Sequence, residues 1–345
     1  MSGGDFWTLS PAEQSARLQN LAHQAVRQWG VSECDLELIK FRENAVFKMT
    51  PAEGDATVVR VHRQNYHSDA SLQSELEWMA MLGERGIVVP LPVPTAAGDV
   101  MVKQSIDDVP GEWQVDMLSW LAGTQLGDIG EPLDLGDRER AAVFRNIGRT
   151  MARLHNFSER WPRQMQLTRH AWDGAGLVGD EPLWGRFWEL EALTESQRTF
   201  LLQAKSAIAE DLQAYGQTGA NYGLIHADLV PENVFVDGLE IQLIDFDDAG
   251  YGWHMFEVVT ALYWLDAEPD YPEIMAAVFE GYRLERALSD ADLAAFDLFV
   301  AARSLTYVGW VHTRSNTATA QEMAPLCIER AESFCARYLD QRGDS

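Results

Sequence analysis

Residues Leu224–Gly250 read LIHADLVPENVFVDGLEIQLIDFDDAG, and this stretch is the most informative part of the 345-residue chain. It opens with a short apolar segment and continues into a polar loop that holds His226, Asp228 and Asn233. Loops that follow a strand commonly carry functional side chains, because the strand holds the start of the loop in place. The loop is therefore the first candidate for a functional site.

A β-hairpin is expected directly after this loop. Val234–Val236 and Ile241–Ile244 are apolar segments of strand length, and Asp237–Gly238 between them is a typical turn sequence. Asp245 follows the second strand. Because a hairpin reverses the direction of the chain, it returns Asp245 to the neighbourhood of the polar loop.

The polar side chains of this region suit a divalent ion. Asp228, Asn233 and Asp245 offer carboxylate and amide oxygens, which are the ligands that Mg²⁺ prefers. The spacing Asp-x4-Asn matches the catalytic loop of kinases, where the Asp accepts a proton from the attacking hydroxyl and the Asn helps to hold a metal ion. Asp245 and Phe246 stand where kinases carry a metal-binding Asp-Phe pair. The alternative, a hairpin with solvated acids at its turns, is disfavoured because the motifs occur together and in order.

This segment resembles the phosphotransferase family that contains aminoglycoside phosphotransferases, choline kinases and homoserine-kinase-like enzymes. That family reads H-x-D-x4-N and then I-D-F or I-D-W, and this chain has His226, Asp228, Asn233 and Ile244–Phe246 in those places. The resemblance implies an α+β, bilobal, protein-kinase-like fold with a small antiparallel-sheet lobe and a larger, mostly α-helical lobe. It implies a nucleotide-binding lobe over residues 1–120, and a helical lobe with the catalytic loop and the substrate pocket over residues 121–345.

The net charge restricts the partners. The chain has 53 Asp and Glu against 27 Lys and Arg, which gives a formal charge of −26. A field this negative argues against nucleic acid and anionic membranes as partners. It favours a cationic small molecule, although a solvated acidic surface explains the same excess. The apolar fraction of 46% is ordinary for a globular protein, and the length allows two lobes with their own cores. Oligomeric state is left open.

Cysteine usage and the N-terminal sequence indicate a cytoplasmic protein. The three cysteines are widely spaced and form no Cys-x2-Cys pair, so neither a disulfide framework nor a zinc site is expected. The first residues lack the basic and apolar segments of a signal peptide. The best candidate for a membrane span, Phe296–Val311, contains Asp297 and Arg303 and is expected to be a buried helix.

The first 120 residues are expected to form a helix, a meander of strands and a second helix. Ser10 to Glu13 form a capping box with Pro11 at the first helical position, and Gly30 ends the apolar repeat that follows. Strand-like segments cover, in order, Asp35–Phe41, Ala45–Met49, Ala56–His62, Val100–Ser105 and Asp116–Leu121. A second helix is expected from Ser71 to Arg85, and an exposed turn over Asp107–Glu112.

The resemblance implies several places in this lobe that hold a nucleotide. At the turn containing Asn44 the family offers main-chain N–H groups to the phosphates, and an ordinary hairpin turn is the alternative because this loop has no glycine. Arg60 stands where kinases have the strand lysine that grips the α- and β-phosphates, and Glu75 stands where they have the helix glutamate that orients it. A solvent-facing arginine on an edge strand is the alternative for Arg60. Ser119 and Leu121 lie in a segment that resembles the hinge, whose main-chain groups hold the adenine.

The second part of the chain is expected to be largely helical. Helices are expected over Arg138–His155, Ser196–Tyr215, Met255–Trp264, Pro272–Leu284, Asp290–Ser315 and Thr319–Gln341, with a turn at Gly250–His254. The tryptophan-rich segment Phe157–Trp188 resembles an insertion in one bacterial branch of the family. Its aromatic residues suit either a substrate wall or packing of the large lobe. Glu257 stands where the family carries an Asp that braces the catalytic loop.

The resemblance implies transfer of the γ-phosphoryl group of ATP or GTP to a hydroxyl of a small molecule. Asp228 is the expected catalytic residue, and Asn233 and Asp245 are the expected Mg²⁺ ligands. Supporting roles are expected for His226, Asp247 and Glu257. Asp248 either assists metal or substrate binding or lies on the surface.

No residue names the acceptor. Glu232 adds a negative charge beside the loop, which suits an amine-bearing alcohol of the aminoglycoside, choline or homoserine type. Two other functions stay open, a stress-response-type protein Ser/Thr kinase and a catalytically degenerate nucleotide-binding module. The first is disfavoured because no Ala-Pro-Glu sequence follows Asp245. The second is disfavoured because Asp228, Asn233 and Asp245 are all retained.

Overall fold

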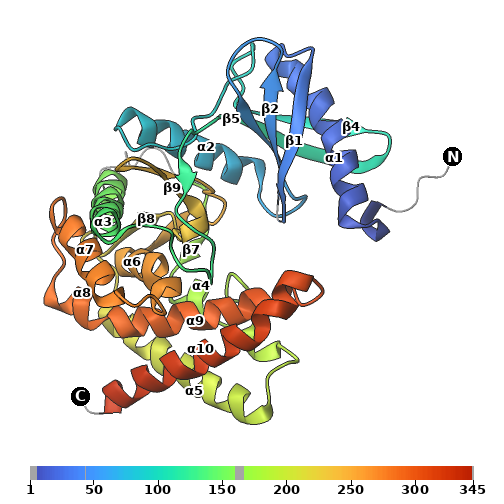
Figure 1. Cartoon of the computed structure of the whole chain (residues 1–345). Coiled ribbons are helices and arrows are strands. Elements are labelled where there is room, and N and C mark those ends of the chain that lie inside the picture. Colours follow the sequence, from blue (N-terminus) through green and yellow to red (C-terminus); the bar gives the residue numbers. More distant parts are fainter. Residues whose placement is uncertain (1–5, 43, 160–166, 344–345) are drawn as a thin grey trace. The chain divides into compact units, whose positions relative to one another are not determined.

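The computed structural model describes residues 6–42, 44–159 and 167–343 (Figure 1). The chain divides into two compact units. The first comprises the chain up to Gly123 together with a short segment that includes Leu167 and Thr168, and the second comprises the rest of the chain from Thr124 onward. In these described ranges no helix is both long enough and apolar enough to cross a membrane.

The first unit contains a five-stranded antiparallel sheet, and two long helices belong to the same unit (Figure 1). Its elements are η1 (Phe6–Thr8), α1 (Pro11–Ala25), η2 (Val26–Trp29), β1 (Cys34–Phe41), β2 (Ala45–Pro51), β3 (Thr57–Val61), α2 (Asp69–Glu84), β4 (Met101–Ile106) and β5 (Val109–Ser119). The strands lie in the order β1-β2-β3-β5-β4, and each pair of neighbours is antiparallel.

Helix α1 follows directly from the sequence pattern. The Ser10 hydroxyl accepts a hydrogen bond from the Glu13 main-chain N–H at 3.3 Å, and Glu13 accepts one from the Ser10 N–H at 3.0 Å. This capping box fixes the start of the helix, as the sequence predicts. Leu18 and Leu21 are fully buried on one face, where they join a core built with the alternating buried residues of the sheet.

The second unit is mostly helical and contains two small sheets. Its elements are β6 (Thr124–Gln125), α3 (Asp137–Glu159), β7 (Ala171–Trp172), α4 (Gly174–Val178), η3 (Phe187–Glu189), α5 (Glu195–Tyr215), β8 (Tyr222–Ile225), η4 (Pro231–Asn233), β9 (Val234–Asp237), β10 (Glu240–Leu243), β11 (Gly250–Trp253), α6 (His254–Leu262), η5 (Tyr263–Leu265), α7 (Tyr271–Arg283), α8 (Asp290–Ala294), α9 (Phe296–Thr313) and α10 (Ala318–Gly343). The sheets have the orders β10-β9-β6 and β7-β11-β8.

Helix α6 is the centre of this second unit. Every residue of α6 is buried, and the helix contacts α3 and α9 (Figure 1). Helices α9 and α10 lie side by side and both pack on α5. Because α6 also contacts β8 and β11, it connects the helices to the strands that carry the polar loop.

Helices α3 and α7 approach each other closely at two glycines. A Cβ added to Gly148 would lie 2.0 Å from the main-chain oxygen of Val278, and one added to Gly281 would lie 1.8 Å from that of Arg145. Real Cβ atoms do not approach an oxygen this closely, so the missing side chains allow this helix pair to pack backbone against backbone.

Several boundaries differ from those the sequence predicts. The hairpin turn is Gly238–Leu239 instead of Asp237–Gly238, because Asp237 still pairs with Glu240. Gly238 has φ +59°, as the first turn position of a type II′ hairpin requires. The expected helix over Asp290–Ser315 is divided into α8 and α9 at Ala295.

One prediction about strands is wrong and another is right only in part. Gly250–Trp253 is the strand β11 instead of a turn. The exposed turn expected over Asp107–Glu112 is confined to Asp107–Asp108, and β5 begins at Val109. Two glycines conceal β11 because glycine is a poor strand former. Gly252 is needed there because a Cβ would lie 2.4 Å from the side chain of Ile225 on the neighbouring strand.

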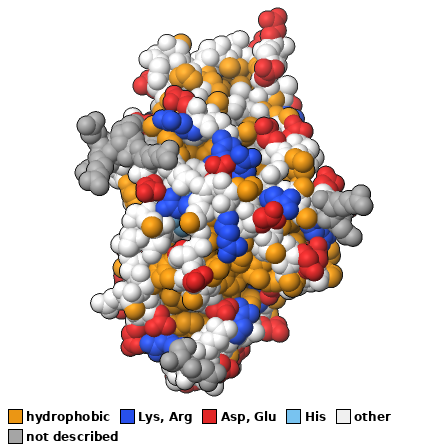
Figure 2. Space-filling model, turned by 90° about the vertical axis from the view of Figure 1, so that its left-hand side faces the viewer, with side chains coloured by type: hydrophobic (Ala, Val, Ile, Leu, Met, Phe, Trp, Pro, Cys, Tyr) orange, Lys and Arg blue, Asp and Glu red, His pale blue; other side chains and the backbone are white. Residues whose placement is uncertain are grey.

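The charged side chains are mixed on the surface. Figure 2 shows Asp and Glu scattered over one face with Lys and Arg among them, instead of a patch of one sign. The excess of acids over bases in the whole chain, 53 against 27, forms no single acidic patch on this face. Such a distribution favours solvation of the surface over a single docking patch.

Candidate active site

The polar loop after β8 is held by α6 in a strained conformation. Ala227 has φ +66°, in the left-handed region that non-glycine residues rarely adopt. The two carboxylate oxygens of Glu257 accept hydrogen bonds from the main-chain N–H groups of His226 at 3.0 Å and Ala227 at 2.6 Å. Burial raises the pKa of Glu257, while His226 and these N–H groups act in the opposite direction. The longer side chain, where the family has Asp, thus reaches both N–H groups of the loop.

His226 connects the loop to the end of the hairpin. Its Nε2 lies 2.8 Å from the main-chain oxygen of Ile244, which can only accept, so Nε2 carries the proton. Nδ1 then accepts the main-chain N–H of Asp228 at 3.3 Å. The ring is fully buried and packs on Phe246 at a centroid distance of 4.5 Å. These contacts give His226 a supporting place in the loop and no access to a substrate.

Asn233 brings the catalytic loop and the hairpin end together. Its Nδ2 donates to Oδ2 of Asp228 and to the main-chain oxygen of Asp228, both at 2.9 Å. Its main-chain oxygen accepts the N–H of Ile244 at 3.0 Å. Asp245 follows Ile244 directly, is exposed, and has φ +65°. These contacts bring Asp228, Asn233 and Asp245 close together in the second unit.

The donor set fits Mg²⁺ bound together with a nucleotide. Both hydrogens of the Asn233 amide point to Asp228, so the amide oxygen Oδ1 faces the other way and is available as a ligand. Among the described residues no group of three or more His, Cys, Asp or Glu could hold a metal ion by itself. Mg²⁺ commonly uses one or two carboxylates and takes its remaining ligands from water and phosphate oxygens. The predicted ligands Asn233 and Asp245 are compatible with a site of that incomplete kind.

Asp247 and Asp248 are held from the segment 169–172. The guanidinium of Arg169 donates to main-chain oxygens of Phe246 and Asp247. The main-chain oxygen of Asp248 accepts from Trp172 Nε1 at 2.8 Å and lies 2.9 Å from Nε2 of His170. The loop that follows Asp245 is thus fixed by side chains of the tryptophan-rich segment.

The Asp248 side chain belongs to the same group of acids. Trp184 Nε1 donates to its Oδ1 at 3.0 Å. Burial, together with the charges of Asp228 and Asp247, raises the pKa of Asp248 to about 8. The Asp247 side chain is buried as well. A cation in this neighbourhood would relieve the repulsion among these carboxylates.

Arg303 is a member of the site that the sequence motifs do not reveal. It lies on α9, is fully buried, and donates from Nη2 to Oδ1 of Asp228 at 2.9 Å. Burial alone would lower its pKa, but the neighbouring Tyr307 and Asp228 raise it. Asp228 itself keeps 22% of its side chain exposed. One signal is present in the sequence: a lone Arg in the apolar run Phe296–Val311 must find a partner inside the protein.

In the first unit Arg60 pairs with two carboxylates. Its Nη1 donates to Glu75 at 2.8 Å, the partner that the family resemblance implies. Nε and Nη2 form a bidentate pair with Asp116 at 2.9 and 2.7 Å, and His62 also contacts Asp116 at 2.7 Å. The Asp116 pairing was hidden in the sequence, since β3 and β5 become neighbours only in the folded sheet. Arg60 is buried and does not face solvent on an edge strand, which excludes that alternative.

The other residues expected to contact the nucleotide, Asn44, Ser119 and Leu121, differ in whether they are free to do so. The Asn44 side chain is buried and accepts the main-chain N–H of Arg63 at 3.1 Å, and Glu43 beside it lies outside the described residues. Ser119 uses its N–H and its hydroxyl for Leu91, both at 2.8 Å. Within the described part of the chain, the main-chain groups of Leu121 have no hydrogen-bond partner. Leu121 is therefore better suited than Ser119 to donate to an adenine edge.

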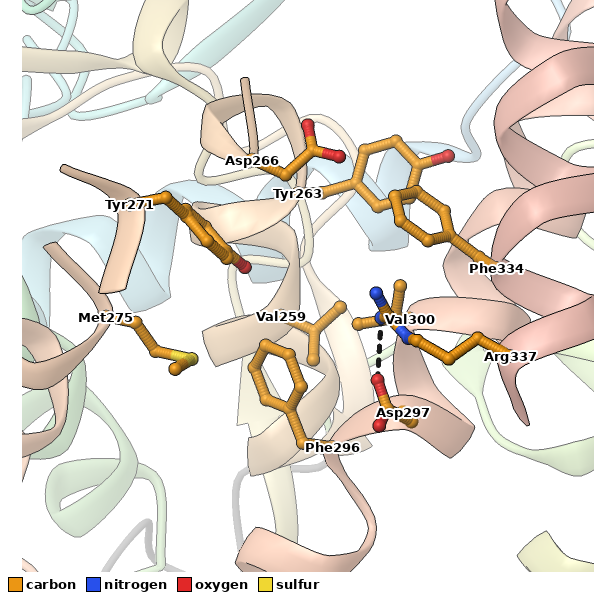
Figure 3. Close-up of a pocket in the computed structure, with 10 residues that line it drawn as sticks. All are labelled: Val259, Tyr263, Asp266, Tyr271, Met275, Phe296, Asp297, Val300, Phe334 and Arg337. Carbon is orange, nitrogen blue, oxygen red and sulfur yellow. Dashed lines mark ion pairs between the residues drawn. The ribbon is translucent and has the colours of Figure 1, made fainter. Parts of the chain in front are cut away.

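A separate pocket lies among the helices of the second unit. It has a volume of about 310 Å³ and is lined by Val259, Tyr263, Asp266, Tyr271, Met275, Phe296, Asp297, Val300, Phe334 and Arg337. Figure 3 shows Tyr271 and Arg337 reaching toward its middle, with Arg337 paired to Asp297 at 2.6 Å. None of the residues expected to act in catalysis lines this pocket.

Comparison with known proteins gives consistent relatives. The sequence pattern of the phosphotransferase enzyme family matches residues 37–299. A solved microcompartment-associated aminopropanol kinase is 32% identical, with a TM-score of 0.80 over 94% of this chain and 98% of that chain. The homoserine kinase of Gluconobacter oxydans is 27% identical over 313 residues, 85% of this chain and 87% of that protein.

Amicoumacin kinases are also similar. The Bacillus subtilis protein is 24% identical over 314 residues, which are 88% of this chain and 87% of that protein. A solved amicoumacin kinase in complex with AMP-PNP and Ca²⁺ is 22% identical, with a TM-score of 0.73 over 93% of this chain and 95% of that chain. The structural matches confirm the α+β, kinase-like fold class expected from the sequence.

Proposed function

Because the chain belongs to the phosphotransferase enzyme family, we propose that it transfers the γ-phosphoryl group of ATP to a hydroxyl of a small amino alcohol. The match to the family over residues 37–299 confirms the resemblance seen in the sequence, and the chain is a phosphotransferase. The exact acceptor and the choice of ATP over GTP belong to the proposal.

The observation that carries the proposal is that the Asp228 carboxylate is both fixed in position and partly exposed. Its two oxygens are held by Arg303 and Asn233, yet part of its side chain remains exposed. A carboxylate that is fixed in position and still accessible can receive the proton of an acceptor hydroxyl. Phosphoryl transfer depends mainly on positioning and electrostatics, so few further groups are needed.

The remaining residues have distinct proposed roles. Asn233 and Asp245 would hold Mg²⁺, whose positive charge offsets the negative charge of the nucleotide phosphates. Glu257 and His226 keep the loop in its strained shape. Arg60 uses three of the five N–H donors of a guanidinium for Glu75 and Asp116, and the other two can face the α- and β-phosphates.

The acceptor class follows from charge and from the relatives. Asp228, Asp245 and Asp247 place three carboxylates in the neighbourhood of Asp248, where an ammonium group is attracted and a carboxylate is repelled. The 32% identical relative is an aminopropanol kinase. We therefore put short amino alcohols before amino acids such as homoserine. Glu232, half-buried beside the loop, remains a predicted contributor to this preference.

Turnover of a small panel of acceptors tests the proposal. ADP release is measured with ATP and Mg²⁺ in the presence of 1-amino-2-propanol, ethanolamine, choline, homoserine or 1,2-propanediol. In a parallel series GTP replaces ATP and GDP release is measured. Amino alcohols should be turned over with a higher kcat/KM than 1,2-propanediol, the matched neutral acceptor. Equal turnover of the neutral diol would contradict the amine preference, and no turnover of any acceptor would contradict the function.

The same assay separates catalysis from nucleotide binding alone. Asp228→Asn should abolish ADP release while a thermal shift by ATP and Mg²⁺ persists, because the nucleotide contacts are elsewhere. The cytoplasm remains the proposed location, on the basis of the thin and unpaired cysteine usage.

A further inference from the structure

We propose that Arg303 is the residue that positions Asp228 for proton transfer, acting from inside the core without touching the acceptor or the nucleotide. The inference rests on the proposed phosphotransferase function. It assigns a role in that reaction to helix α9, which lies outside the catalytic loop and the hairpin.

Arg303 cannot reach a ligand directly. Its side chain is 0% exposed, whereas the Asp228 side chain that it contacts is 22% exposed. Nη2 donates to Asp228 Oδ1 at 2.9 Å and lies 3.1 Å from the hydroxyl oxygen of Tyr307. The ion pair therefore runs from the core outward, and of its two side chains only that of Asp228 is partly exposed.

Aromatic rings hold the guanidinium in one orientation. Its central carbon lies 4.5 Å from the ring centroid of Trp184, 4.5 Å from that of Tyr307 and 5.3 Å from that of Phe256. These rings come from three elements, the segment before η3, helix α9 and helix α6. A cation between ring faces is attracted to them and is kept from rotating.

The cage is itself fixed by hydrogen bonds. Trp264 Nε1 donates to the Tyr307 hydroxyl at 2.8 Å, and Trp184 Nε1 donates to Asp248 at 3.0 Å. Trp184 thus covers Arg303 with its face while its edge binds an acid of the same site. The orientation of Arg303 is determined before any substrate arrives, which is the condition for preorganised catalysis.

The energetics favour a functional role over a stabilising one. Of the described contacts of Arg303, none satisfies Nε or Nη1, although both atoms are buried. A buried charge with unsatisfied donors is costly, and replacing a buried ion pair by apolar side chains is often neutral or stabilising. A buried ion pair that two apolar side chains could replace without loss of stability, and that includes the proposed proton acceptor, is best explained by the reaction.

The chemistry requires the carboxylate to keep its place. As the acceptor oxygen forms its bond to the γ-phosphorus, the bond from that phosphorus to the β–γ bridging oxygen breaks and ADP leaves. The hydroxyl proton passes to Asp228. Arg303 on Oδ1 and Asn233 on Oδ2 together fix the plane of the carboxylate. Without Arg303 the carboxylate can rotate away and the proton transfer loses its geometry.

The chain offers a matched control in Arg330. This arginine on α10 is also caged by three rings, those of Tyr263, Trp264 and Phe334, at 4.6, 4.9 and 5.1 Å. It pairs with Asp266 at 2.7 Å instead of Asp228. Arg303→Met and Arg330→Met therefore remove the same kind of caged guanidinium, but only the first removes a partner of Asp228.

The experiment compares the wild type with Arg303→Met, Arg303→Lys and Arg330→Met. It measures kcat, the KM for ATP, the KM for 1-amino-2-propanol, and Tm. Arg303→Met should lower kcat roughly 100-fold with both KM values nearly unchanged. Its Tm should not fall below that of Arg330→Met, whose kcat should stay near the wild-type value. Arg303→Lys keeps the charge and should restore part of the lost kcat.

Each outcome bears on one of the two proposals. If the wild type turns over an acceptor and Arg303→Met keeps its kcat, the positioning role is wrong while the proposed function stands. The role is also wrong if Arg330→Met loses as much kcat as Arg303→Met, or if the loss in Arg303→Met only parallels a loss of folded protein. A wild type without turnover overturns the proposed function and this inference with it.

Discussion

At the scale of single residues, Glu257 has a contact that its charge alone does not explain. One carboxylate accepts two main-chain N–H groups, and one of them belongs to Ala227 in a left-handed conformation. A carboxylate offers two acceptor oxygens, whereas an amide offers only one. The strained loop therefore depends on the acid at this position.

Replacing Glu257 by Gln should be destabilising for this reason. One buried N–H would face the amide NH₂ and lose its partner, which costs about 1–3 kcal/mol. We expect the free energy of unfolding, measured with urea, to fall by about this amount, together with kcat. Glu273→Gln on the exposed face of α7 is the control and should change neither quantity. An unchanged stability in Glu257→Gln would show that the loop holds its shape without this contact.

Asp116 gives a prediction about pH. Burial alone would raise its pKa, but Arg60 and His62 outweigh burial and hold the pKa below its ordinary value. A lowered pKa contributes stability above the unfolded pKa of about 3.9, and this stability is lost as the pH falls toward the folded pKa.

Asp116→Asn should therefore destabilise the protein most at neutral pH. Breaking a buried ion pair costs about 3–5 kcal/mol, because the remaining charge is left without its partner. The difference from the wild type should be large at pH 7 and shrink below about pH 4. Urea unfolding at pH 7 and pH 3.5 measures it, with the exposed Asp55→Asn as the control. A difference that grows toward low pH would contradict the assigned cause.

At the scale of elements, the contact between α3 and α7 depends on two missing side chains. Ala is a better helix former than Gly by about 1 kcal/mol, so propensity alone predicts that Gly148→Ala is stabilising. The added Cβ would instead lie 2.0 Å from the Val278 oxygen, which is rigid backbone. Overpacking of this kind costs about 1–3 kcal/mol.

We therefore expect Gly148→Ala to lower the free energy of unfolding. Gly174→Ala is the matched control, because Gly174 begins α4 and a Cβ there meets nothing within 4 Å. Chemical denaturation of the two variants beside the wild type should separate them by more than 1 kcal/mol. If both glycines tolerate Ala equally, the two helices can move apart without cost.

The elements also show what can be predicted from the sequence. The capping box at Ser10 and the spacing of Asp228 and Asn233 are local patterns, and their physical consequences arise within a few residues. Strand β11 cannot be recognised in this way, because its pairing with β8 and β7, and not its own two glycines, makes it a strand.

Long-range contacts are the second limit. The bond from Arg303 to Asp228 spans 75 residues, and no spacing rule relates two positions so far apart. The same holds for Asp116, which lies 56 residues from Arg60 and meets it across paired strands. The motif residues were predictable because the family repeats them, whereas their partners depend on the packing of this particular chain.

At the scale of the whole molecule, the charge of −26 is the main feature. Excess charge of one sign destabilises a compact state through self-repulsion, and salt screens that repulsion. We expect Tm to rise when NaCl is increased from 20 to 300 mM at pH 7.5. Glucose at equal osmolarity is the control for a general solute effect. A Tm that falls with NaCl would show that the ion pairs outweigh the repulsion.

The division of the chain into two lobes bears on whether each lobe folds independently, as well as on function. The nucleotide-binding lobe predicted over residues 1–120 stays a prediction, although the chain separates into compact units between Gly123 and Thr124. Each unit has its own buried core, so each has the means to fold as a unit. Urea unfolding followed both by tryptophan fluorescence and by circular dichroism would show whether the units unfold in one transition or two.

The grip of Glu257 on the loop also has a consequence for amide exchange. The N–H groups of His226 and Ala227 belong to no helix or strand, and their protection from solvent deuterium comes from one side chain on α6. Because every residue of α6 is buried, both amides should exchange together, when the second unit opens far enough to release this helix. These two amides therefore report how often α6 leaves its place beside the loop.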